Sequence, residues 1–200
     1  MTNDIEYTFY PWGPYLFKTT LDKLFCEELL KKGVETKIDA SKDLAGHISS
    51  QKRFDKNDML WFAEKCSNIF NTYLESSKEF YGKKIGNKLN LESLWINFMK
   101  KGDFNPPHTH TADLSFVIFL NVPNELLEEQ KNYKGTDDVG PGGLSFHYGE
   151  VIGDNKFVIQ NNIKPKVGDF LIFPANLRHM VYPFKSDGER ISVSGNLFFI

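Results

Sequence analysis

The 200-residue chain lacks the features that mark several classes of protein. Its two cysteines, Cys26 and Cys66, are too few for a disulfide framework, and no apolar stretch reaches the length of about 18 residues that spans a membrane. The opening MTNDIEYTFY has neither the basic nor the apolar region of an export signal. The 24 basic and 26 acidic residues give a net charge of −2, which excludes a generic polycation for nucleic acid or anionic membranes. These absences predict a cytoplasmic protein.

Arginine is also scarce. Only Arg53, Arg178 and Arg190 occur among the 24 basic residues. Lysine supplies the same charge, but only a guanidinium presents a rigid fork of donors that matches a carboxylate. Each arginine therefore raises the question of what lysine could not do at that position.

Helical periodicity is confined to residues 1–85, which we expect to form a helical support region. Thr19 and Asp22 form a loose capping box before a first helix that ends near Gly33, and a second helix is predicted from Asn57 to Phe80. Both cysteines fall on the apolar stripes of these helices, which favours buried small side chains over redox or metal roles. Between the helices, LAGHISSQKRF is polar and typical of turns.

Residues 86–200 have the pattern of strands. Short β-branched and aromatic runs occur in the segments SLWINFM, DLSFVIFLNV, GLSFHY, KFVIQ, DFLIF, HMVYPF and RISVSGNLFFI. Because no helical periodicity separates them, they predict an antiparallel sandwich or barrel. The charged segment 123–143 is predicted to be a loop, either a lid or surface decoration. We expect one integrated domain that is mainly β with N-terminal helices.

Three of the five histidines lie in two segments of the β region. A Pro-Pro loop precedes His108 and His110, whose i, i+2 spacing places both imidazoles on one face of a strand. His179 begins a later strand after the connection ANLR. Three imidazoles at strand ends can surround one metal ion and leave positions open for substrate. The alternative for an H-x-H pair is an exposed strand edge without a metal.

The last predicted strand has one polar face. Arg190, Ser192, Ser194 and Asn196 alternate with apolar residues. If this face points into a barrel-like interior, the guanidinium needs an anionic partner, and the strand itself contains no acidic residue. Arg190 can hold a carboxylate through two parallel hydrogen bonds, and Ser192 can add another donor. The pattern predicts a carboxylate-bearing ligand.

Several segments together resemble the Fe(II)/2-oxoglutarate-dependent oxygenase superfamily, whose core is a double-stranded β-helix (jelly roll). They are PPHTHTADLSFVIFLNVP, GGLSFHYG, VGDFLIFPANLRHMVYPF and ERISVSGN, with LAGHI upstream. Within the superfamily, the chain is most similar to the compact prolyl- or aspartyl-hydroxylase-like proteins of bacteria and tailed phages. The resemblance implies Fe(II) as the metal, with 2-oxoglutarate and O2 as co-substrates.

The resemblance also implies roles for individual residues. His108 and His179 would be the proximal and distal iron ligands. Arg190 and Ser192 would bind the far carboxylate of 2-oxoglutarate through the R-x-S motif of the superfamily. Asn97 lies where related proteins often place a polar residue that contacts the co-substrate, and its alternative is an edge amide bonded to the backbone.

The third iron ligand departs from the superfamily pattern, which has Asp or Glu two residues after the first histidine. This chain has His110 there. His110, Asp113 or a water molecule can complete the site, and the i+2 geometry favours His110. A β-bulge between His110 and Asp113 would undo that preference.

These features predict an Fe(II)- and 2-oxoglutarate-dependent dioxygenase that hydroxylates a protein side chain or small metabolite and releases succinate and CO2. The near-neutral charge argues against a nucleic-acid substrate. A cupin-type metal-dependent dioxygenase that does not use 2-oxoglutarate fits the histidine spacing almost as well, and a non-catalytic jelly-roll module is a further alternative. Arg178 is predicted to lie at the rim of the site, and His47 and His147 are predicted to be structural.

Overall fold

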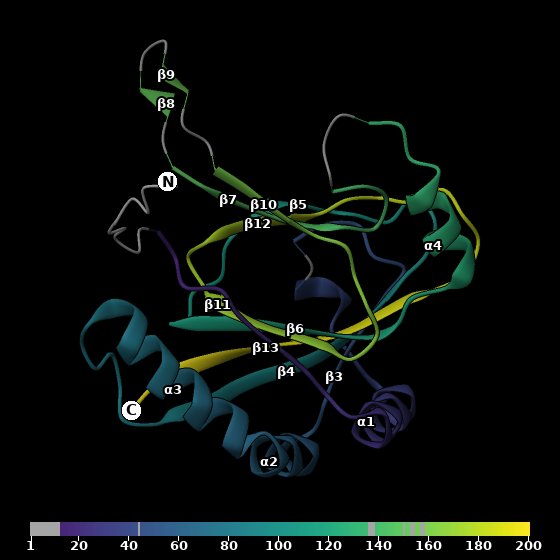
Figure 1. Ribbon diagram of the computed structural model, residues 1–200. Coiled ribbons are helices and arrows are strands. Elements are labelled where there is room, and N and C mark those ends of the chain that lie inside the picture. Colours follow the sequence, from purple (N-terminus) through teal and green to yellow (C-terminus); the bar gives the residue numbers. More distant parts are fainter. Residues whose placement is uncertain (1–12, 44, 136–138, 150, 153–154, 157–158) are drawn as a thin grey trace, which may run out of the picture.

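Two antiparallel sheets lie face to face, and helices cover the outer face of the larger sheet (Figure 1). This computed structural model describes residues 13–43, 45–135, 139–149, 151–152, 155–156 and 159–200. In spatial order, the larger sheet contains β1 (Phe17–Thr20), β11 (Asp169–Pro174), β6 (Leu114–Asn121), β13 (Arg190–Phe199), β4 (Leu89–Met99), β3 (Ser50–Arg53) and β2 (Ile38–Asp39). The smaller sheet contains β10 (Ile159–Ile163), β7 (Leu144–Tyr148), β12 (Arg178–Val181) and β5 (Asn105–His108).

The remaining elements lie outside the two sheets. They are the short hairpin β8 (Val151–Ile152) and β9 (Asn155–Lys156), the helices α1 (Lys23–Glu35), α2 (Lys56–Lys65), α3 (Ser67–Tyr81) and α4 (Asn124–Lys131), and a 3-10 turn at Ser41–Asp43. The predicted mainly β fold with N-terminal helices is confirmed. Within the described residues, no helix is long and apolar enough to cross a membrane.

The central strands of the larger sheet are covered on both faces. In β6, Phe116 and Ile118 point into a core shared with the helices, whereas Val117 and Phe119 point into a second core between the two sheets. Alternating side chains of one strand point to opposite faces, so a strand covered on both sides is apolar throughout. Polar residues on the inner face of this sheet are therefore exceptions that need an explanation.

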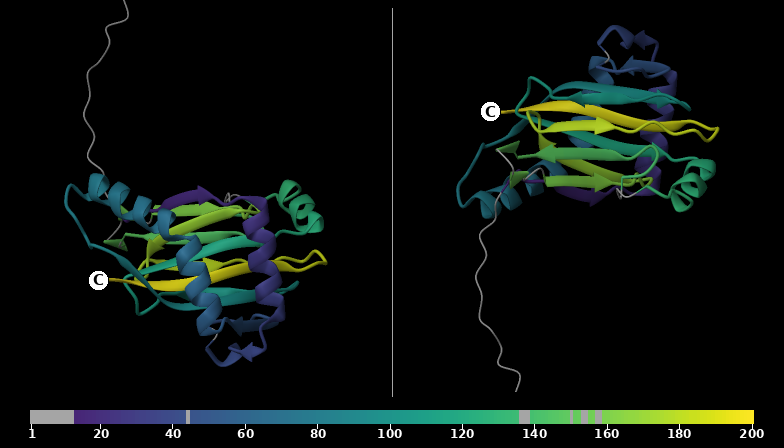
Figure 2. Two further views of the ribbon diagram at one scale, coloured as in Figure 1. Left: turned by 90° about the horizontal axis from the view of Figure 1, so that it is seen from below. Right: turned by 90° about the horizontal axis from the view of Figure 1, so that it is seen from above.

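The helix layer crosses the outer face of the larger sheet (Figure 2, left). The first helix begins after Asp22, whose carboxylate accepts a hydrogen bond from the Phe25 backbone N–H at 2.9 Å. The predicted capping box was therefore wrong about Thr19, which lies in β1 and pairs with Phe170.

The predicted single helix from Asn57 to Phe80 is two helices. The chain breaks at Cys66, where φ is −90° and ψ is 3°, and Cys66 is both the C-cap of α2 and the N-cap of α3. The apolar periodicity continues across the break because Phe62 in α2 and Phe70 in α3 pack into the same core. Cys26 and Cys66 are buried free thiols in this core, as expected, and burial raises the pKa of Cys66 to about 12.

Two segments predicted to be irregular contain regular structure. The polar segment SSQKRF forms β3, which pairs with β4, and its strand conformation depends on that neighbour rather than on its own propensity. The predicted loop 123–143 contains α4, whose buried Leu126 packs against the second core. The KFVIQ run supplies parts of β9 and β10, although residues 157–158 lie outside the described residues.

Candidate functional site: a histidine cluster beside a buried arginine

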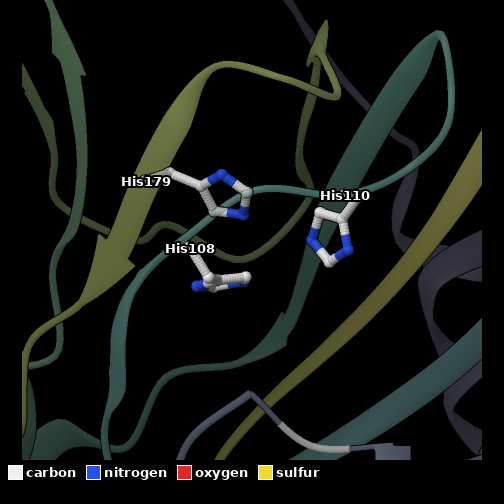
Figure 3. Close-up of side chains that lie close together, drawn as sticks. All are labelled: His108, His110 and His179. Carbon is white, nitrogen blue, oxygen red and sulfur yellow. The ribbon is translucent and has the colours of Figure 1, made fainter.

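Three histidines converge at one end of the space between the sheets. Their ligand nitrogens all lie within 4.8 Å of one another, and their imidazoles point toward a common centre (Figure 3). His108 ends β5 and stands directly opposite His179 of the neighbouring strand β12. We call His108, His110 and His179 the histidine cluster.

His110 reaches the cluster by a different route from the one predicted. β5 ends at His108, so His110 lies in the loop beyond the strand rather than on the same face of it. The backbone N–H of His110 donates to the Ala175 carbonyl at 2.8 Å, and the Ala175 N–H donates to the Asp113 carbonyl at 3.0 Å. These two bonds fasten the loop to the end of β11 and hold the His110 side chain beside the other two.

Backbone carbonyls fix the ring nitrogens of two of the histidines. Nδ1 of His108 lies 2.7 Å from the Pro106 carbonyl, and Nδ1 of His179 lies 2.9 Å from the Leu177 carbonyl. A carbonyl can only accept, so each Nδ1 donates its proton to the carbonyl, and Nε2 is the ring nitrogen that remains for a metal ion. Metal-binding histidines are commonly oriented in this way.

The cluster is electrically neutral where it is most buried. Burial, assisted by the charge of His108, lowers the pKa of His110 to about 4 and that of His179 to about 3. Both imidazoles are therefore unprotonated at neutral pH, which is the form that binds a metal ion.

Arg190 lies in the same cavity as the histidine cluster and is fully buried. This first cavity has a volume of about 200 Å³. The Arg190 side chain is 1% exposed, its guanidinium lies 4.8 Å from the ring of Phe119, and its Nη1 donates to the sulfur of Met99 at 3.1 Å.

The guanidinium has no anionic partner among the described residues. Its Nε has no hydrogen-bond partner there, and the described lining of the first cavity includes no Asp or Glu. Burial lowers the pKa of Arg190 to about 10, so the group stays cationic at neutral pH. An unpaired buried charge is costly, and an anionic ligand in the cavity would offset that cost.

A row of polar side chains crosses the inner face of the larger sheet beside Arg190. Ser192 of β13 pairs with Asn97 of β4, which pairs with Gln51 of β3. All three are buried and line the first cavity. Ser192 and Asn97 were predicted from the sequence. Gln51 was not, because it lies in a polar segment and only its pairing with β4 places it in the interior.

The other candidate residues lie apart from the cluster. The carboxylate of Asp113 accepts the Phe199 backbone N–H at 2.8 Å and is not among the residues that converge with the histidines. Arg178 is exposed on β12 and does not line the first cavity. His147 contacts the hydroxyl of Ser145 at 2.9 Å, and His47 is exposed and pairs with Phe104 in an isolated bridge.

The donor set fits a metal ion with an anionic co-ligand. Three imidazoles suit a divalent transition metal, and three protein ligands leave coordination positions open. Residues 93–196 match the family model described as "Putative 2OG-Fe(II) oxygenase". The chain belongs to this 2OG-Fe(II) oxygenase family. Its members use ferrous iron and 2-oxoglutarate. No curated protein sequence matches the chain.

Solved structures share the fold of this family member. A viral collagen prolyl hydroxylase from Paramecium Bursaria Chlorella virus-1, in complex with 2-oxoglutarate, matches with a TM-score of 0.61 and 19% identity over 94% of this chain and 98% of the viral chain. A prolyl-4-hydroxylase from Pseudomonas putida matches with a TM-score of 0.54 and 14% identity over 92% of each chain.

A third structure extends the range of reactions. The α-ketoglutarate-dependent epimerase SnoN of nogalamycin biosynthesis matches with a TM-score of 0.56 and 15% identity, over 92% of this chain and 78% of SnoN. These likenesses confirm the predicted double-stranded β-helix. They leave the reaction to be argued from the site, since one fold supports several chemistries.

Proposed function

We propose that the protein is an Fe(II)- and 2-oxoglutarate-dependent dioxygenase that hydroxylates its substrate and releases succinate and CO2. His108, His110 and His179 would hold the iron. Arg190, Ser192 and Asn97 would bind 2-oxoglutarate. The observation that carries the proposal is the buried Arg190, which shares one cavity with three convergent histidines and has no acidic partner among the described residues.

The residues around the cavity would have two roles, binding of the co-substrate and orientation of the metal ligands. When bound, ferrous iron and 2-oxoglutarate would reduce O2, the oxidant of the reaction, while the protein orients the reactants and excludes water. The Arg190 guanidinium would neutralise the far carboxylate, and the Ser192 hydroxyl would donate to the same group. The Pro106 and Leu177 carbonyls keep the imidazoles of His108 and His179 in the tautomer that presents Nε2.

The buried position of Arg190, where it could bind a carboxylate, favours this function over a cupin-type enzyme that does not use 2-oxoglutarate. A histidine cluster alone serves either enzyme. In an enzyme without an anionic co-substrate, the buried guanidinium beside that cluster would have no acidic partner in the described lining of the cavity. The histidines, held by backbone bonds and convergent within 4.8 Å, also favour a metal-binding protein over a non-catalytic module.

Binding of 2-oxoglutarate to Arg190 variants tests the proposal. The affinity of the Mn(II)-loaded protein for 2-oxoglutarate is measured by calorimetry, and succinate release is measured with Fe(II) and ascorbate. Arg190→Lys should weaken 2-oxoglutarate binding by about tenfold or more, because an ammonium cannot form two parallel hydrogen bonds to a carboxylate. Arg178→Lys is the matched control, because Arg178 is exposed on β12 of the smaller sheet and does not line the first cavity, and it should bind normally. Equal 2-oxoglutarate affinity in Arg190→Lys and the parent protein would contradict the assignment, as would failure of the parent to bind 2-oxoglutarate.

A further inference from the structure

Arg190 is held from both sides by the two strands that flank its own. It lies on β13, between β4 and β6 in the larger sheet (Figure 1). Met99 stands directly opposite it on β4, and the Met99 sulfur accepts the hydrogen bond from Nη1 at 3.1 Å. On the β6 side, the ring of Phe119 lies 4.8 Å from the guanidinium carbon. The guanidinium therefore lies between an aromatic ring and a thioether.

Met99 gives the guanidinium its directional contact. The Met99 side chain lines the first cavity, is 1% exposed and packs in the second core between the sheets. Among the described residues, the Arg190 side chain makes no other hydrogen bond. A ring contact does not select one N–H group, whereas a hydrogen bond does. The orientation of the guanidinium therefore depends on the sulfur of Met99.

The kind of acceptor at position 99 matters because Arg190 has to remain available for an anion. A thioether sulfur is an uncharged and weak acceptor. It can fix Nη1 without neutralising the guanidinium, whereas a carboxylate at this place would form an internal ion pair. Nη1 carries two N–H groups, so one bond to Met99 leaves the other, together with those of Nη2, for two parallel bonds to a carboxylate.

We propose that Met99 is a positioning residue for co-substrate binding, and that its sulfur holds the Arg190 guanidinium in the orientation that receives the carboxylate. This inference rests on the proposed function, because the carboxylate is that of 2-oxoglutarate. Met99 acts through Arg190 and need not touch the co-substrate. The affinity for 2-oxoglutarate should therefore depend on the hydrogen-bond acceptor at position 99 rather than on the volume of the side chain.

Two substitutions separate hydrogen bonding from packing. Met99→Leu keeps an apolar side chain of similar volume without an acceptor, whereas Met99→Gln keeps an acceptor on a side chain of similar length. Met99→Leu should weaken binding of 2-oxoglutarate to the Mn(II)-loaded protein by about three- to tenfold, as for the loss of one hydrogen bond. Met99→Gln should bind as the parent does. A packing role predicts the reverse order. Met180→Leu is the matched control, because Met180 of β12 does not line the first cavity.

The NMR signals of the guanidinium give a second measurement, which needs neither metal nor co-substrate. The chain has only three arginines, so Arg190→Lys assigns the signals of Arg190. Rotation about the Cζ–Nε bond exchanges Nη1 with Nη2, and a hydrogen bond at Nη1 slows it. In Met99→Leu this rotation should be about three- to tenfold faster than in the parent, because the bond is lost. In Met99→Gln it should stay slow.

The two measurements separate this inference from the proposed function. If the parent binds 2-oxoglutarate, equal affinity in Met99→Leu would overturn the inference and leave the proposed function in place, as would an equal loss in Met99→Leu and Met99→Gln. If the parent does not bind 2-oxoglutarate, the proposed function fails. Faster rotation in Met99→Leu alone would then still support the hold of Met99 on Arg190, and equal rotation in all three proteins would overturn it.

Discussion

His110 stands where the superfamily pattern has a carboxylate, and the structure places its imidazole within the cluster. We therefore expect His110→Ala to lower Fe(II) affinity by about ten- to a hundredfold, because one of three ligands is lost. His110→Asp should retain metal, since a carboxylate oxygen is also an iron ligand. The measurement is iron content after anaerobic loading and dialysis.

Asp113 provides the control for that comparison. Its carboxylate accepts the Phe199 backbone N–H, so Asp113→Asn should lose stability but keep its iron. Iron content that falls in Asp113→Asn and stays unchanged in His110→Ala would reverse the assignment of the third ligand.

Neutral buried histidines make the stability of the metal-free protein depend on pH. The pKa of His179 is lowered to about 3 by burial, whereas an unfolded chain titrates near 6.5. Below about pH 6.5 the unfolded state binds a proton that the folded state does not, so stability falls as pH decreases toward the folded pKa. At pH 5 the loss is about 2 kcal/mol for this residue. Urea unfolding between pH 7 and pH 5 measures it.

His179→Phe is the comparison variant for this dependence. The ring is packed among Phe146 and Phe173, so a phenyl group is compatible with the surroundings. The unfolding free energy of this variant should depend less on pH over the same range. An identical dependence in both proteins would show that His179 is not the group responsible.

At the scale of elements, Gly195 in β13 occupies a position in the larger sheet where its neighbours leave no room for a side chain. A Cβ at this position would lie 2.5 Å from Cζ of Phe116 and 2.5 Å from the backbone oxygen of Ser93. The backbone oxygen cannot move without displacing β4. We expect Gly195→Ala to lower the free energy of unfolding by about 1–3 kcal/mol in urea titrations.

A second substitution separates the two contacts of Gly195. Phe116→Leu removes the ring but leaves the Ser93 carbonyl, so Gly195→Ala should cost less in the Phe116→Leu background. A Gly195→Ala protein as stable as its parent would contradict the packing of β13 against β4.

Some strands could be predicted from the sequence and others could not. The strands β4, β6, β11 and β13 were predictable because burial on both faces requires apolar runs, and the polar face of β13 stood out against that background. β3 was not predictable, since its polar sequence becomes a strand only by pairing with β4. Gln51, which lies on β3, was missed for the same reason.

The site shows the same limit. The convergence of His108, His110 and His179 was predicted correctly, but the assumed strand geometry at His110 was wrong. The bonds that position His110 run to Ala175, which is distant in sequence, and no local pattern encodes them. Residue type and spacing therefore predicted the members of the cluster, whereas tertiary contacts decide how each one reaches it.

At the scale of the molecule, the helix layer and the larger sheet share one core. The rings of Phe62 in α2 and Phe116 in β6 stack with centroids 5.5 Å apart, and both side chains are fully buried. Without the helices, the outer face of the sheet would expose its apolar residues to water. Residues 1–85 and 86–200 are therefore expected to unfold together.

Tryptophans in the two parts can report on this cooperativity. Trp61 of α2 stacks on Phe25 within the helix layer, with ring centroids 5.5 Å apart, and Trp95 of β4 lines the candidate site. Two proteins with one tryptophan each are needed. Trp12→Phe combined with Trp95→Phe keeps only Trp61, and Trp12→Phe combined with Trp61→Phe keeps only Trp95.

If the core is shared, urea should unfold both single-tryptophan proteins in one transition, with the midpoints and slopes that circular dichroism gives for each. Each Phe variant changes stability slightly, so the comparison is made between probes within one protein. A Trp61 transition that precedes the loss of β-sheet signal would mean that the helices detach while the sheet persists. That result would divide the chain into two folding units, and the sheet would then have to hold the histidine cluster without the helix layer.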